Sequence, residues 1–287
     1  MSAAFVCSAS AAVSIEEAKQ LGGSALTAWG AEKAGNKDGT IPAYTGEPTP
    51  KPASYNPKDP GQHPDPWNDK PLFSITAQNY TKYADKLDGM ADMFKRFPNY
   101  RMDVYPTRRS FIYPKWVLDN IAKNATACKA IDDELKLEGC YGGMPFPIPK
   151  SGKQVMWNHL TQFEAHDVES GATENYVIPT NGPAVMVGQS GGYFKYPFYD
   201  STKTGPRPSN SILQKVRIVD NAPARMAGGG TLVIDSLDMI DAGRRAWLYI
   251  PGQRRVKLAP DLAYDTPSPY SGGGATMDDQ KAFMGAL

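Results

Sequence analysis

The stretch "RRAWLYIPGQRRVKLAP", residues 244–260, is typical of two short strands joined by a Pro-Gly turn. Side chains alternate across a strand, so a turn of even length places four apolar side chains on one face: Trp247, Tyr249, Val256 and Leu258. The opposite face then mixes aliphatic side chains with Arg255 and Lys257, whose apolar stems can lie on an apolar surface while their charged ends reach water. The sequence predicts a hairpin whose aromatic face is dry.

The stretches before this hairpin alternate in the same way. "ENYVIPTNGPAVMVGQ" (174–189) predicts a hairpin with Asn181 and Gly182 at its turn, and "SILQKVRIVD" (211–220) and "GGTLVIDSLDMI" (229–240) predict two further strands. Consecutive short strands after a run of helices are typical of an antiparallel meander. The fold class that we expect is therefore α+β.

Four helices are expected upstream of these strands: residues 15–21, residues 76–97, a helix from Pro114 onward, and residues 153–161. A capping box of Ser14 and Glu17 begins the first, and proline suits the first turn of the third. In the last helix, the spacing places Val155, Met156 and Leu160 inward.

A proline-rich stretch lies between the first two helices. Nine prolines fall between Pro42 and Pro71, which excludes a central strand or a long helix. A disordered linker is one interpretation. An extended arm wrapped on the domain is the other, and we favour it because disordered segments usually lack large apolar side chains such as Trp29, Ile41, Tyr44, Tyr55 and Trp67.

The N-terminus has the composition of the end of an export signal. Ala9-Ser10-Ala11 has the small-x-small form that signal peptidase cleaves, although no basic region precedes it. An ordinary flexible terminus is the alternative. Cleavage there would remove Cys7 and leave Cys128 and Cys140, which in an exported chain predict a disulfide rather than two separate thiols.

Composition excludes several classes of partner. The chain has 31 basic and 30 acidic residues, a net charge of +1, so it lacks the basic excess of a nucleic-acid-binding protein. No apolar run approaches the roughly 20 residues of a transmembrane segment. The cysteines and the three histidines show no metal-ligand spacing, so we expect no metal and no cofactor.

Seven stretches carry a resemblance to a known family: "GAEKAGNKDGTIPAYTG" (30–46), "HPDPW" (63–67), "DKPLFSITAQNYTKYADKL" (69–87), "YRMDVYPTRRS" (100–110), "EGCYGGMPFPIPKSG" (138–152), "WNHL" (157–160) and "RRAWLYIPGQRRVKLAPDLAYDTP" (244–267). Together they resemble the bacterial domain-of-unknown-function family 1329, which is described as outer-membrane lipoprotein-sorting-like. The resemblance covers most of residues 14–267.

This resemblance implies a periplasmic protein of a Gram-negative bacterium, related to the LolA/LolB lipoprotein carriers. Such carriers fold as a strongly curved antiparallel sheet, an unclosed half-barrel, whose hollow is covered by helices and holds acyl chains. The resemblance also implies an inner-membrane resistance-nodulation-division (RND) type transporter and an outer-membrane protein as partners. The family has no established catalytic residues, so none is carried over.

The expected organisation has four parts. Residues 1–12 are the signal remnant, 13–75 the short helix and proline-rich arm, 76–265 the LolA-like domain, and 266–287 a Gly-rich tail that begins further strands. The export signal lacks its beginning, and family members usually extend beyond residue 287. We therefore expect a chain truncated at both ends.

A carrier needs an apolar wall that its own helices leave partly uncovered. The candidate wall residues are Val216, Ile218, Leu232, Ile234, Trp247, Tyr249, Val256 and Leu258, and the alternative for each is ordinary core. Arg254, Arg255 and Lys257 are candidates for contact with an anionic headgroup or an acidic partner, or else protect a solvated sheet edge.

Two other classes of function stay open. An enzyme is disfavoured because the chain lacks G-x-S-x-G and H-E-x-x-H motifs and a phosphate-binding loop, and "GQSGG" (188–192) has the wrong spacing for a nucleophile turn. His63, Asp65 and Asp69 on the arm could form a site, although Asp65 fits an Asx turn better, and His159 fits a structural role. An envelope adaptor that binds a partner along a free sheet edge is the third class.

Overall fold

The structure, a computed structural model, describes residues 13–59, 61, 63–262, 265–268 and 273–279. Contacts divide the chain into two compact units. The larger joins the described residues up to Ala31 with those from Tyr113 onward, and the smaller is Glu32–Ile112. The boundary suggested at residue 75 falls inside the smaller unit. The predicted signal remnant, with Cys7, lies outside the described residues.

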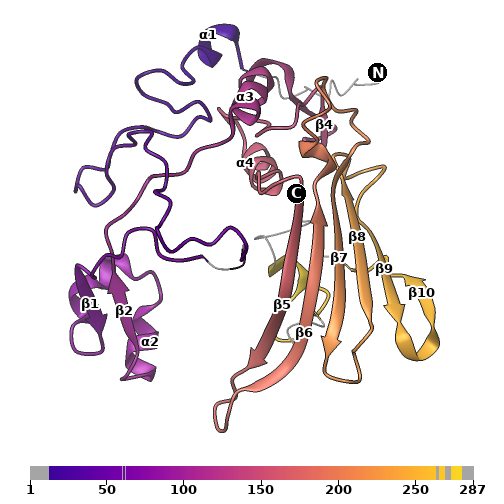
Figure 1. The fold of residues 1–287 in the computed structure, drawn as a ribbon. Coiled ribbons are helices and arrows are strands. Elements are labelled where there is room, and N and C mark those ends of the chain that lie inside the picture. The colour runs from indigo at the N-terminus through magenta and orange to yellow at the C-terminus, as the bar shows by residue number, and fades with distance from the viewer. Residues whose placement is uncertain (1–12, 60, 62, 263–264, 269–272, 280–287) are drawn as a thin grey trace, which may run out of the picture. The chain divides into compact units, whose positions relative to one another are not determined.

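The larger unit is built on one six-stranded antiparallel sheet (Figure 1). Its strands are β5 (Asp167–Val177), β6 (Val185–Lys195), β7 (Ile212–Ala222), β8 (Gly230–Ser236), β9 (Arg245–Ile250) and β10 (Arg255–Leu258). Each strand pairs with its neighbours in the chain, and β5 and β10 form the two edges. The predicted antiparallel meander is confirmed and its sheet is open, whereas the strong curvature of a half-barrel stays a prediction.

The hairpin of β9 and β10 has the predicted register. A turn of four residues, 251–254, separates the strands, so Val256 pairs with Tyr249 and Leu258 with Trp247. The turn contains the 3-10 helix η3 (Pro251–Gln253) and ends at Arg254, whose φ of 49° is left-handed.

The aromatic face of this hairpin is not dry, and that prediction is wrong. Tyr249, Val256 and Leu258 are 40%, 64% and 62% exposed. The buried face is the other one, because Ala246 packs there with Val233. We call the face that carries Trp247 and Tyr249 the open face, and its reverse the closed face.

Two helices of the larger unit lie at the end of the sheet where β6 ends and β7 begins (Figure 1). They are α3 (Lys115–Ala127) and α4 (Gly152–Leu160), which share one core with η2 (Pro197–Tyr199). α3 begins directly after Pro114, close to the predicted position. In α4, Val155 is 51% exposed, which contradicts its predicted inward position, because Trp157 is fully buried and sets the inward face.

A disulfide joins Cys128 and Cys140, the two cysteines that the sequence singled out. It closes a short hairpin of β3 (Lys129–Ile131) and β4 (Lys136–Glu138). The turn of this hairpin is held by α4, since the Trp157 indole Nε1 donates to the Glu134 carbonyl at 2.7 Å.

The N-terminal described segment packs within the larger unit. α1 (Ile15–Ala18) is a single turn, shorter than the predicted helix over 15–21, and the Ser14 hydroxyl accepts from the Glu17 backbone N–H at 3.2 Å. Further on, the Trp29 and Tyr113 rings meet edge to face with centroids 5.6 Å apart.

The described part of the predicted C-terminal tail also packs on this unit. Pro267 forms an isolated bridge with Thr276, and the 3-10 helix η5 (Met277–Asp279) follows. Met277 is buried against Val233, Ala246 and Leu262 on the closed face of the sheet. Residues 280–287 lie outside the described residues.

The smaller unit has its own core of Ile75, Leu87 and Phe94. Its elements are β1 (Phe73–Thr76), η1 (Tyr80–Lys86), α2 (Ala91–Arg96) and β2 (Arg101–Val104), with β1 and β2 paired. The predicted helix over 76–97 is wrong. Asp88 and Gly89 have φ of 35° and 83°, values that an α-helix cannot contain, so the segment divides into two short helices.

The proline-rich stretch of the smaller unit has little regular secondary structure. Arg109 holds part of it, because its Nη1 donates to the Lys33, Ala34 and Pro42 carbonyls at 3.2, 3.1 and 3.2 Å. The same guanidinium lies over the Tyr44 ring, 5.8 Å from the centroid. The wrapped arm stays a prediction.

Two glycines test how tightly the segment 13–31 packs against the rest of the larger unit. Gly22 and Gly30 have φ of 73° and 85°, so alanine at either position costs about 1–2 kcal/mol of backbone strain. At Gly30 a Cβ would also lie 1.7 Å from the Pro147 carbonyl oxygen, whereas at Gly22 nothing lies within 4 Å. We predict that Gly30→Ala lowers the free energy of unfolding by about 1–3 kcal/mol more than Gly22→Ala in urea denaturation. Equal losses would contradict this packing.

Candidate functional site

The open face of the sheet presents three rows of side chains that cross β7 to β10. The first row is Val219, Gly230, Tyr249 and Val256. The second row is Arg217, Leu232, Trp247 and Leu258. The third row is Lys215, Ile234 and Arg245. Because directly paired residues share a face, these rows follow from the register alone.

A hollow of about 470 Å³ lies over the first two rows. It is bordered by Arg217, Ile218, Val219, Gly228, Gly229, Gly230, Thr231, Leu232, Trp247, Tyr249 and Val256. Gly230 lies between Val219 and Tyr249 and has no side chain to fill the space. The volume is within the range of small-molecule sites, roughly 300–1,000 Å³.

Most of the predicted wall residues share the open face. Those on it are Leu232, Ile234, Trp247, Tyr249, Val256 and Leu258. Val216 lies on the closed face, where it packs against the buried cluster of Val233 and Ala246. Ile218 borders the hollow, but its pairing with the buried Thr231 places its side chain on the closed face.

The predicted headgroup cations lie away from the hollow. Arg255 and Lys257 pair with Ile250 and Leu248, so their side chains are on the face opposite Trp247. Arg254 lies in the turn between β9 and β10.

The cations on the open face are different ones: Arg217, Lys215 and Arg245. Sequence reasoning missed their association. The alternation of residues 211–220 puts Lys215 and Arg217 on one face of their strand. Their position beside Leu232 and Ile234 requires the register between β7 and β8, which that alternation does not contain.

The predicted arm residues do not form a site. The Asp65 Oδ1 accepts from the Trp67 backbone N–H at 2.9 Å, the Asx turn that its sequence favoured. Asp69 forms an ion pair with Arg108, and His63 is exposed. Within the described residues, no group of three His, Cys, Asp or Glu side chains is placed to hold a metal ion.

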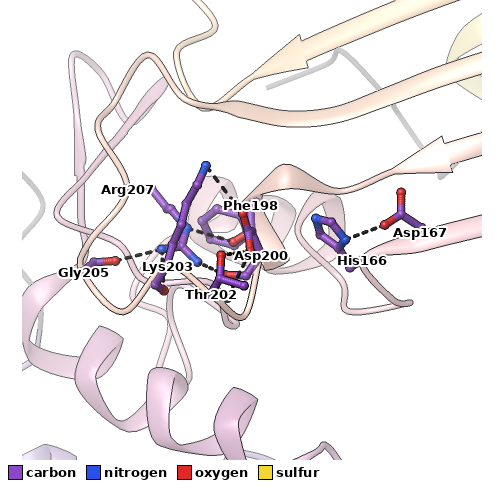
Figure 2. Close-up of polar contacts among 8 residues, drawn as sticks. All are labelled: His166, Asp167, Phe198, Asp200, Thr202, Lys203, Gly205 and Arg207. Carbon is purple, nitrogen blue, oxygen red and sulfur yellow. Dashed lines mark hydrogen bonds and ion pairs between the residues drawn. The ribbon is translucent and has the colours of Figure 1, made fainter.

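A second polar cluster surrounds Arg207, near the start of β7 (Figure 2). Its guanidinium donates to the carbonyls of Phe198, Asp200, Lys203 and Gly205 at 2.9–3.0 Å. Burial lowers the pKa of Arg207, and the nearby Asp200 opposes that shift. These bonds fold the loop from 198 to 207 around one cation, so we assign Arg207 a structural role.

The neighbouring His166 and Asp167 also have partners (Figure 2). The His166 Nδ1 lies 2.5 Å from an Asp167 carboxylate oxygen, and the Lys195 Nζ lies 3.1 Å from the other. The hydrogen bond from Lys195 is the main cause that lowers the pKa of Asp167. This exposed pairing indicates a charge network of the sheet rather than a catalytic base.

With this geometry described, comparison with known proteins identifies the family. The family model "Protein of unknown function (DUF1329)" matches residues 74–287. The chain belongs to the DUF1329 family. The resemblance found in the motifs is thereby confirmed, whereas the relationship to the LolA/LolB carriers stays a prediction.

Two relatives give the extent of the likeness. An uncharacterized protein of Pseudomonas aeruginosa is 39% identical over 282 residues, which are 96% of this chain and 60% of that protein. The chain thus spans about 60% of the length of this relative. A crystal structure of a DUF1329 family protein from Desulfovibrio piger covers 39% of each chain, with 17% identity and a TM-score of 0.27. Among the described residues, no helix has both the length and the apolar composition needed to cross a membrane.

Adjacent residues of β8 test the assignment of the two faces. Leu232 is 37% exposed on the open face, and Val233 is 7% exposed in the core. We predict that Val233→Ser costs about 2–3 kcal/mol of unfolding free energy and Leu232→Ser less than about 1 kcal/mol, measured by urea denaturation. A larger loss for Leu232→Ser would mean that the hollow is part of a covered core.

Asp220 lies behind the glycines of the hollow and gives a test by pH. Its Oδ1 is buried and accepts no hydrogen bond within the described residues, and burial raises its pKa. The ionised carboxylate therefore costs stability at neutral pH, and that cost disappears as the pH falls below about 4, where the carboxyl is protonated in both states.

We predict that Asp220→Asn raises the free energy of unfolding at neutral pH and that the gain vanishes in acid. Asp167→Asn is the control, because Lys195 lowers the pKa of that carboxylate, and a small loss of stability is expected. Denaturation at a series of pH values measures both differences. A gain for Asp220→Asn that persists in acid would exclude the ionised carboxylate as its cause.

Proposed function

We propose that this DUF1329 protein binds a lipid or another hydrophobic molecule in the hollow of the open face. It would act as a periplasmic carrier that works with an inner-membrane RND-type transporter and an outer-membrane partner. The observation that carries the proposal is the hollow itself, which aromatic and aliphatic side chains line on an exposed face of the sheet.

The two faces of the sheet differ in how much of their apolar surface the chain itself buries. The closed face already buries Val233 and Ala246 against the chain's own Leu262 and Met277. On the open face, Val256 and Leu258 remain 64% and 62% exposed. Exposed apolar patches of this kind mark interaction sites, and an alkyl chain gains about 0.8 kcal/mol for each CH₂ that it buries.

Two coarser features support the envelope setting. An open antiparallel sheet with helices at one end is compatible with the LolA-like half-barrel expected from the family. A disulfide between Cys128 and Cys140 suits an oxidising compartment such as the periplasm.

An envelope adaptor is the second candidate, and the edge of the sheet favours it. All four residues of β10 are exposed, so its free edge is open to pairing with a strand of a partner. A carrier and an adaptor differ in one respect: only the carrier retains a hydrophobic ligand when purified.

Gly230 offers a direct test of the hollow. Its backbone angles are ordinary, and a Cβ would lie 3.4 Å from the Ile218 carbonyl oxygen, an ordinary contact. Gly230→Leu would thus add a side chain between Val219 and Tyr249 and fill the hollow. Gly171→Leu is the matched control, because Gly171 lies in the same sheet and nothing lies within 4 Å of its Cβ position.

We predict that the wild type and Gly171→Leu, purified under native conditions from an envelope fraction, retain a lipid in native mass spectrometry. Gly230→Leu is expected to lose most of it while keeping its unfolding midpoint. An empty wild-type protein would favour the adaptor. Retention by Gly230→Leu at the wild-type level would place the ligand elsewhere.

A further inference from the structure

Three cations beside the hollow have no acidic partner among the residues that the structure describes. Within the described part of the chain, no carboxylate forms an ion pair with Lys215, Arg217 or Arg245. Arg217 instead lies over the Tyr193 ring, 4.9 Å from the centroid. Lys195 of β6, which pairs with Lys215, does have an acidic partner in Asp167.

The register arranges these charges around an apolar track. Along β8 the open face presents Gly230, then Leu232, then Ile234, and Lys215 and Arg245 flank Ile234 on the two neighbouring strands. The two flanking Cα atoms are about 10 Å apart because two strand spacings separate them. From the first row to the third the track runs about 13 Å, four residues of a strand.

This track suits a molecule with one apolar chain and one compact anionic end. The hollow of about 470 Å³ lies at the glycine end of the track. Arg217 borders the hollow itself. Lys215 and Arg245 lie at the other end of the track, where a carboxylate placed over Ile234 would have one of them on each side. Such a carboxylate would be attracted by both cations, whereas a neutral end group would leave them without an opposite charge.

We infer that the hollow takes an anionic single-chain amphiphile of the fatty-acid class, with its chain over Gly230 and Leu232 and its carboxylate beside Lys215 and Arg245. This inference rests on the proposed function, because it names the ligand of the same hollow. It also moves the headgroup site from the β9–β10 hairpin, where Arg255 and Lys257 lie on the opposite face, to the third row of the open face.

The test compares two ligands that differ only in their end group, dodecanoate and dodecanol. Each is used to displace Nile red, a neutral dye, from the protein at neutral pH. The double variant Lys215→Gln/Arg245→Gln removes the inferred site. The control Arg255→Gln/Lys257→Gln removes the same charge from the other face of the same sheet, and Gly230→Leu reports whether the dye occupies the hollow.

We predict that the wild type binds dodecanoate about tenfold more tightly than dodecanol, as two exposed charge contacts allow. Lys215→Gln/Arg245→Gln is expected to abolish this preference without weakening dodecanol, and Arg255→Gln/Lys257→Gln to retain it. The preference should also shrink at high salt, since solvent-exposed charges are screened.

Several results would overturn the inference. Some of them refute only the anionic ligand, and others refute the proposed carrier function as well. Equal binding of the two ligands, with Gly230→Leu still blocking both, refutes the anionic ligand but leaves an apolar one. If both double variants lose the preference for dodecanoate over dodecanol to the same extent, the net charge of the protein causes the preference and the position of Lys215 and Arg245 does not. Tighter binding of dodecyl phosphate than of dodecanoate assigns a phosphate end group instead. Absence of any binding, or a dimer in sedimentation that Leu258→Ser dissociates, overturns the carrier together with its ligand.

Discussion

The alternation of side chains along β8 and β9 is the constraint on which the open face depends. Val233 and Ala246 point into the core, so their neighbours Leu232 and Trp247 must point to the other side. A slip of one residue would exchange the two sets and expose the core. The four-residue turn of the last hairpin maintains this arrangement into β10, where Val256 and Leu258 continue the apolar surface.

Three consecutive glycines border the hollow, and each does so for a different reason. Gly228 has a φ of 81°, in the left-handed region, and it begins the run that enters β8. At Gly229 a Cβ would lie 2.8 Å from the Met226 carbonyl oxygen, so that position is closed to larger residues. Gly230 is different, because its backbone would accept a side chain. The path of the chain therefore does not require glycine there, and the missing side chain increases the volume of the hollow.

Sequence periodicity was sufficient to place at least part of each strand of the six-stranded sheet and the register of the last hairpin, but it did not reveal the short strands β1 to β4 or which face of the sheet is covered. The cover of the closed face comes from Leu262 and Met277, which follow the sheet in the chain and carry no periodic signal. The same reason accounts for the error at Val155, since Trp157 sets the buried face of α4 through contacts with residues outside the helix.

The candidate site was predictable to a similar degree. Six wall residues share the open face because they lie at even spacing on paired strands. The cations beside them come together only through the pairing of β8 with β7 and with β9. Alternation within one strand does not reveal which residues of the neighbouring strands lie opposite it.

The two ends of the sheet differ in how firmly they are backed, and this bears on binding. The end near α3 and α4 is backed by the large core that includes Trp157 and the disulfide of Cys128 and Cys140. Behind the hollow, the closed face is backed by a much smaller buried cluster, to which the late segment contributes Met277. Regions with few buried contacts open at lower free energy than the global core, so a ligand in the hollow would stabilise the part of the sheet that the chain itself supports least.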